Sequence, residues 1–198
     1  TIEIGQVWIV LNGGTLEAGS TTALSSSSAF TVAGGATLDL GGHDNTISSL
    51  STSGGTITDT SGAGSGGTLR LASSMPAGPT AHLFTGSLGL QLYGGNLANT
   101  ILNNTANDYS GGTIIGNGSG STMTRMLLVS AGTLGAGSPG AVTSGIFGTG
   151  PITMGAATTD KSQLYFGSTL TVNYDLVVNS ELGTDVPGTF RVESTGVV

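Results

Sequence analysis

The histidines and carboxylates are the side chains of this chain that could carry out acid–base chemistry. His43 and Asp44 are adjacent in the glycine-rich stretch 41–45, and His82 stands between Ala81 and Leu83. Neighbouring side chains rarely point into one site, and neither histidine lies in a Gly-x-Ser-x-Gly or His-Glu-x-x-His motif. We therefore interpret His43 as part of an exposed turn and His82 as a residue at a strand edge.

A groove that cleaves polysaccharides needs carboxylates gathered on one face. The eleven acidic residues are spread along the chain, and Asp39, Asp59 and Asp175 would align only if the fold placed them in register. The chain has no Cys, which excludes disulfides and thiolate metal ligands, and it lacks the Gly-Gly-x-Gly-x-Asp repeat of calcium-binding rolls. The sequence predicts no catalytic residues, no cofactor-binding residues, no metal site and no cofactor, and hence a protein that is not an enzyme.

The composition is poor in charge. Only 8% of the residues are charged and the formal net charge is −7, whereas an ordinary soluble domain has about 25% charged residues. The four basic residues, which are Arg70, Arg125, Lys161 and Arg191, cannot form a phosphate-binding stripe, so nucleic acid is not expected as a partner. Ser, Thr and Asn must cover the surface instead, as is typical of extracellular repeat proteins. No apolar stretch is long enough to predict a membrane-spanning helix.

A short sequence motif recurs along the chain. It consists of two small residues, usually Gly-Gly, then Thr or Ala-Thr, then apolar residues at every second position, and it begins at Gly13, Gly34, Gly54, Gly66, Gly111 and Ala131. The first three starts are 21 and 20 residues apart. A loose period of about 20 residues is the mark of a solenoid, in which each coil buries its apolar face against its neighbours. A solenoid of this length would have about eight to ten coils.

The segments that follow each motif alternate between apolar and polar residues, as half-buried strands do. No segment shows a helical period. The sequence therefore predicts an all-β fold, a single-stranded right-handed parallel β-helix. Its outward-facing residues include Asp39, Arg70, Gln91 and Thr171. The residues expected to point inward are Leu38, Leu40, Leu69, Leu71, Leu90, Leu92, Leu127, Val129, Leu164, Phe166, Leu170 and Val172.

Glycine and asparagine are expected at the corners between strands, because both tolerate positive φ and Asn side chains can also stack in ladders. The candidate corner asparagines are Asn45, Asn96, Asn103, Asn104, Asn107 and Asn117. Loops or insertions are expected at 73–80, where two prolines cannot both serve a ladder, and at 116–125. We interpret residues 1–198 as one β-helix domain, an internal fragment of a longer repeat protein, because the strand pattern is still running at residue 198.

Several of these segments resemble a known family. Residues 107–115 read Asn-Asp-Tyr-Ser-Gly-Gly-Thr-Ile-Ile, residues 128–135 end a strand in Gly-Thr-Leu-Gly, and residues 147–153 contain Gly-Thr-Gly-Pro-Ile-Thr. This order is similar to the passenger-associated repeat, or autotransporter-associated β-strand repeat, of bacterial autotransporter passenger domains. The likeness covers roughly residues 7–60 and 107–155, and the stretch 116–125 departs from it. The resemblance implies a right-handed parallel β-helix displayed outside the cell, anchored to the outer membrane through a region not in this chain.

The expected function is a structural or adhesive stalk segment of a secreted or cell-surface bacterial protein. One alternative is a subunit of an extracellular filament, sheath or surface assembly, and a polysaccharide-active β-helix enzyme is the third. The expected partners are neighbouring coils of a longer chain or further copies of this one, with surface glycans or host and matrix proteins as possible ligands. The apolar strand 7–11 and the apolar end 197–198 favour such end-to-end contacts, because open edges are templates for pairing.

Overall fold

The computed structural model describes residues 7–51, 54–71, 82–93, 96–98, 102, 104–118, 123–128, 132–166, 170–179 and 190–192. These residues form short strands joined by turns, with no helix among them. Within the described ranges, all strand pairs are parallel except one hairpin and one isolated bridge. The chain is therefore an all-β parallel solenoid, which confirms the predicted fold class.

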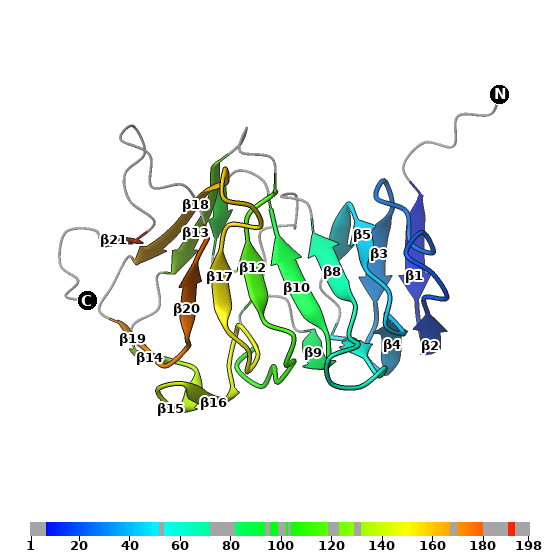
Figure 1. The fold of residues 1–198 in the computed structure, drawn as a ribbon. Helices are drawn as coiled ribbons and strands as arrows, with labels where there is room; N and C mark the ends of the chain where they lie inside the picture. Colours follow the sequence, from blue (N-terminus) through cyan, green and yellow to red (C-terminus); the bar gives the residue numbers. More distant parts are fainter. Residues whose placement is uncertain are drawn as a thin grey trace.

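One face of the solenoid is a continuous six-stranded sheet, in which six successive turns contribute one strand each (Figure 1). Its strands lie side by side from β5 near the N-terminal end to β20 near the C-terminal end. Their bounds are β5 (Asn45–Ile47), β8 (Thr68–Leu71), β10 (Gly89–Leu92), β12 (Thr113–Ile115), β17 (Ile152–Met154) and β20 (Leu176–Val178).

The other faces are built from shorter sheets. One has four strands, β2 (Gly14–Glu17), β4 (Ala36–Asp39), β7 (Thr56–Asp59) and β9 (Leu83–Gly86). Another has three, β1 (Trp8–Leu11), β3 (Ala29–Val32) and β6 (Ser49–Ser51). Towards the C-terminal end lies a second four-stranded sheet of β11 (Asn96–Ala98), β13 (Met123–Leu128), β18 (Lys161–Phe166) and β21 (Phe190–Val192).

Two small pairs complete the fold. Strands β14 (Gly132–Leu134) and β19 (Leu170–Val172) pair in parallel. Strands β15 (Ala136–Ser138) and β16 (Ala141–Ser144) form an antiparallel hairpin, which projects at the lower left of Figure 1. The hairpin stands apart from the coil pattern, because its strands pair with each other and not with the turns before and after.

The length of a turn follows from the strand register. Thr68 pairs with Gly89, and Leu90 with Thr113, so one turn takes 21 or 23 residues there. Thr113 pairs with Ile152, which makes that turn 39 residues long, because it contains β13, β14 and the hairpin. The six-stranded sheet therefore has fewer turns than the eight to ten that the average period predicts.

The core is a column of apolar side chains inside the coil. Seven of the residues predicted to point inward are buried: Leu38, Leu40, Leu69, Leu71, Leu90, Leu92 and Leu164. Leu170 and Val172 are partly buried against the same core. The side chains of Leu127, Val129 and Phe166 lie outside the described residues. Met126, which the sequence pattern did not single out, is fully buried.

Three of the four outward-facing residues are less exposed than the alternation predicts. Asp39 and Gln91 are buried, and Arg70 is half-buried with its guanidinium over the ring of Tyr93. The Gln91 amide donates to the Gly116 carbonyl at 2.7 Å, so the following turn covers it. Only Thr171 is exposed as expected. The alternation correctly predicts which side chains point away from the core. It does not predict that a loop of the following turn covers some of them.

The predicted loops are described only in part. Residues 73–80 lie outside the described residues, as do 119–122 of the predicted insertion 116–125. Strand β13 begins at Met123, so the last three residues of that stretch are strand.

We expect Leu38→Ala to lower the free energy of unfolding by about 2–5 kcal/mol, because Leu38 is fully buried and its removal leaves a cavity in the stacked core. Thr37→Ala, a half-buried neighbour in the same strand, should cost less than about 1 kcal/mol. Urea unfolding followed by circular dichroism measures both. Equal losses for the two variants would show that the facing of β4 is wrong.

Candidate functional site

The adjacent residues His43 and Asp44 lie in the turn between β4 and β5, as predicted, but only Asp44 is exposed, and His43 is half-buried. The Asp44 carboxylate is exposed and accepts the Thr68 backbone N–H at 2.7 Å. The His43 backbone N–H donates to the Leu40 carbonyl at 3.0 Å, which closes the turn. The structure thus places Asp44 as a cap on the start of β8, the neighbouring strand of the six-stranded sheet.

His82 is fully buried just before β9 and is a connector between turns. Its Nδ1 lies 3.3 Å from the Gly55 carbonyl oxygen, and its Nε2 contacts the Ser51 carbonyl oxygen. Burial lowers the pKa of His82, although the two carbonyl contacts oppose this shift. The ring also packs edge-on against Phe84. The prediction of a strand-edge residue is therefore right about position, but it missed the burial and the bonding to the preceding turn.

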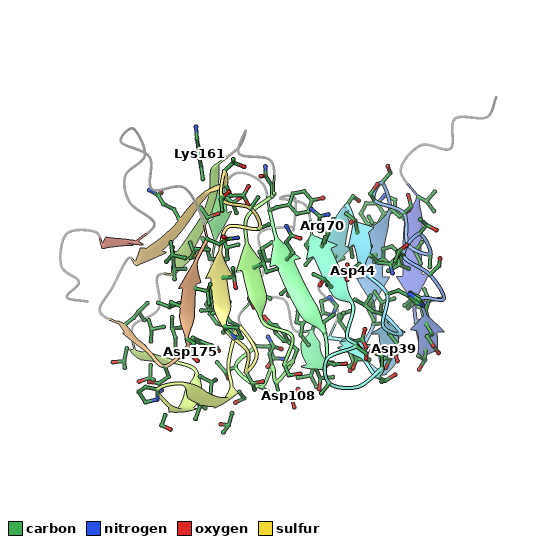
Figure 2. All side chains as sticks on the ribbon, in the orientation of Figure 1. Asp39, Asp44, Arg70, Asp108, Lys161 and Asp175 are labelled. Atoms are coloured by element: carbon green, nitrogen blue, oxygen red, sulfur yellow. The ribbon has the colours of Figure 1, made fainter. Side chains whose placement is uncertain are left out.

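The densest polar site lies at the corner after β4 and β7. Asp39 Oδ1 accepts the backbone N–H groups of Gly41 at 3.0 Å and Thr60 at 3.2 Å, and its Oδ2 accepts the Thr60 hydroxyl at 2.6 Å. Asp39 is 5% exposed and Asp59 is 1% exposed. The two carboxylates lie in successive turns of the coil, because Asp39 is paired in register with Thr58. The corner is shown on the right of Figure 2, where Asp39 is labelled.

Asp59 accepts more bonds than any other carboxylate of the corner. Its oxygens accept the backbone N–H groups of Gly42 at 2.9 Å, Ser61 at 2.9 Å and Gly67 at 2.7 Å. The hydroxyls of Ser61 and Ser87 also donate to Oδ1. Gly42 lies in the turn before Asp59 and Ser87 in the turn after it, whereas Ser61 and Gly67 belong to its own turn. The carboxylate therefore ties three turns together.

Glycine is required around this carboxylate. A Cβ at Gly67 would come within 2.4 Å of the His43 carbonyl oxygen, and Gly42 has a φ of +82°. These glycines let backbone N–H groups approach Asp59 closely. Burial alone would raise the pKa of Asp59, but the bonds from Ser61, Gly67 and Gly42 outweigh burial and lower it. The carboxylate is therefore held in its charged form by backbone dipoles.

The sequence suggested Asp175 as a companion of Asp39 and Asp59, but the structure separates them. Asp175 lies before β20 at the far end of the sheet, as Figure 2 shows, and its carboxylate faces Gly140 of the hairpin turn. A third buried carboxylate, Asp160, accepts the backbone N–H groups of Gly118, Ala156 and Ala157. The sequence reasoning missed it; the signal available was an Asp four residues after Gly155-Ala156 in a turn-rich stretch.

Asparagines bridge successive turns at other corners. Asn45 accepts the Leu24 N–H at 3.0 Å and donates to Ser20, and Asn107 accepts the Phe84 N–H at 3.0 Å and donates to Ile146. Asn104 donates to the His82 carbonyl. Three of the predicted corner asparagines thus do serve the backbone of other turns. Asn173, which the sequence reasoning missed, does the same for Gly135 at 3.0 Å.

Among the described residues, no group of three or more acidic or histidine side chains has an arrangement that could hold a metal ion. The same part of the chain contains no helix with the length and apolarity that crossing a membrane requires. Comparison with protein-family models, with curated proteins and with solved structures gives no match. The chemistry of the corners therefore has to be interpreted from their own geometry: they hold backbone N–H groups and connect turns.

We expect Asp59→Asn to lower the free energy of unfolding by about 2 kcal/mol or more near neutral pH, because a charged acceptor of several N–H groups is lost. The folded-state pKa lies below the ordinary value of 3.8. The Asp59 carboxylate therefore contributes to the free energy of unfolding above pH 3.8. This contribution is lost as the pH falls towards the lower folded-state pKa. Urea unfolding at neutral and at acidic pH should show that the difference in the free energy of unfolding between wild type and variant becomes smaller in acid. Asp108→Asn, at an exposed aspartate, should change stability little, and a difference that persists in acid would contradict the assignment.

We expect His82 to add a second pH dependence at higher pH. Since burial lowers its pKa from the ordinary 6.5, the unfolded chain takes up the proton first, and stability falls as the pH drops from 6.5 towards the folded-state value. Urea midpoints measured on both sides of pH 6.5 should reveal this slope in the wild type and in His43→Gln. His82→Gln should remove it, and a slope that survives in His82→Gln would assign it to another group.

Proposed function

We propose that this solenoid is a non-enzymatic structural stalk segment of a secreted or cell-surface bacterial protein. The resemblance of residues 107–115, 128–135 and 147–153 to the autotransporter passenger repeat supports an extracellular setting. The low content of charged residues and the abundant Ser and Thr support it as well. In the full protein, neighbouring coils of the longer chain would continue the stack at its ends.

The observation that carries this proposal is the use of buried polar groups. Asp59, Asn107 and His82 each bond to the backbone of another turn. Catalytic groups, in contrast, must keep a face available to a substrate. A chain that uses its carboxylates and imidazole to join turns is built for mechanical continuity along the coil axis, which is what a stalk requires.

A subunit of an extracellular filament is the second candidate, and the end strands favour it. Trp8 and Val10 of β1 are 67% and 53% exposed, and Val177 and Val178 of β20 are 46% and 44% exposed. Both strands are the outermost members of their sheets. Apolar edge strands are templates for pairing, so copies of the chain can meet end to end through them.

Labelling of intact cells tests the stalk proposal. Antibodies raised against the 198-residue chain should bind intact cells that produce the parent protein, and external protease should remove the signal. Labelling that appears only after the cells are lysed would refute a surface stalk, because the segment would then lie inside the cell.

Sedimentation velocity over a concentration series separates the stalk from the filament subunit. If the chain is a stalk segment, its ends fit neighbouring coils of its own parent protein and not other copies of itself. We therefore expect the sedimentation coefficient to level off at a small value as the concentration rises. Species that keep growing with concentration, and that Trp8→Lys and Val10→Lys suppress, would favour the filament subunit. The exposed Thr171→Lys is the matched control, because it adds the same charge away from β1.

A further inference from the structure

A hollow of about 240 Å³ lies where the β15–β16 hairpin meets the solenoid. We propose that this hollow is a binding site for a neutral sugar ring. Its described walls include the turn at Thr105, strand β14 at Thr133, and the two strands of the hairpin with the flanking Gly135 and Gly145. Asn173, which follows β19, completes the lining. Insertions that leave the regular coil are where repeat proteins commonly place their binding faces.

The fixed polar group of the hollow is Asn173. Its Nδ2 donates to the Gly135 carbonyl at 3.0 Å and to the Gly137 carbonyl at 3.4 Å, which sets the orientation of the amide. The side chain is only 6% exposed. Within the described residues, Oδ1 accepts no hydrogen bond. The fixed amide therefore leaves Oδ1 as an oriented acceptor on a residue that lines the hollow.

The other polar side chains of the lining are hydroxyls. Thr105 and Thr133 are exposed and Ser144 is half-buried. Each hydroxyl both donates and accepts, and the described lining residues include no charged side chain. Such a set matches a ligand whose own groups are hydroxyls, which also donate and accept. Because no described lining residue carries an opposite charge, an ion would recover less of its lost hydration here than a neutral ligand would.

The wall behind the hairpin is rigid. A Cβ on Gly145 would lie 2.1 Å from the Tyr174 hydroxyl, so this position admits only glycine and the two segments are in close contact. The Tyr174 hydroxyl donates to the Gly148 carbonyl and accepts the Phe147 N–H, and its ring packs edge-on against Phe147. A preformed wall reduces the entropy cost of binding.

The size of the hollow limits the ligand. Its volume corresponds to roughly eight water molecules at about 30 Å³ each, which is below the usual range for drug-sized ligands. One sugar ring, bound alone or as the end of a glycan, is the appropriate size. So small a ligand has few atoms with which to gain binding energy, and we expect a dissociation constant in the millimolar range.

Nuclear magnetic resonance titration of the 198-residue chain tests this site. The probes are the methyl glycosides of glucose, galactose, mannose and N-acetylglucosamine, with glucuronate as the charged comparison. At least one neutral glycoside should shift the amide signals of Gly135, Gly137 and Gly145, and glucuronate should bind more weakly. The titration does not depend on where the protein resides, so its outcome is distinct from that of the cell-labelling experiment.

Thr133→Val and Thr171→Val are the matched variants, because the two threonines are exposed register partners in β14 and β19 and only Thr133 lines the hollow. Thr133→Val should weaken binding about threefold to tenfold, the usual effect of losing one hydrogen bond. Thr171→Val should leave the affinity unchanged. The proposal is overturned if no neutral glycoside shifts these amides, if glucuronate binds equally well, or if Thr171→Val weakens binding as much as Thr133→Val.

Discussion

Each turn of this solenoid depends on the turns before and after it for its backbone hydrogen bonds. In the strands, the parallel ladder supplies them, as where β10 pairs with β8 on one side and β12 on the other. At the corners the ladder is interrupted, and buried N–H groups without partners would be costly. Asp59, Asn45 and Asn107 accept such N–H groups from other turns. The burial of these three polar side chains follows from this requirement.

Hydrogen bonds between turns continue even where one face of the solenoid no longer has regular strands. After β9, the segments 107–110 and 145–149 continue the stack without being strands, yet the Ser110 N–H still donates to Gly86 and the Thr149 N–H to Tyr109. Aromatic side chains fill the interior there: Phe84 packs edge-on against Tyr109, and Phe147 against Tyr174. Burial raises the pKa of the Tyr109 phenol above its ordinary value, and that of Tyr174 to about 12. Large rings thus maintain the core where the β-ladder does not.

The polar chemistry of the chain was only partly predictable. The sequence suggested Asp39, Asp59 and Asp175 as a groove, and it singled out the pair His43 and Asp44 as an exposed turn. Whether carboxylates meet depends on strand register, and one residue of slip sends a side chain to the other face. The structure shows Asp39 and Asp59 together as acceptors of backbone N–H groups and places Asp175 at the other end of the sheet. The roles of Asp160 and Asn173 depend on loops far away in sequence, so a local pattern could not reveal them.

The sequence by itself determined the fold class and the inward face of the coil. Period-two alternation, as at Leu69 and Leu71, places apolar side chains on one side of a strand wherever that strand pairs, and glycine pairs mark the corners because few residues tolerate their backbone angles. Only the tertiary structure decided the register, the 39-residue turn between Thr113 and Ile152, the burial of His82 and Gln91, and the hollow beside the hairpin. Those features arise from contacts between residues 20 or more positions apart, whose energies depend on the three-dimensional arrangement of the turns and not on the local order of residues.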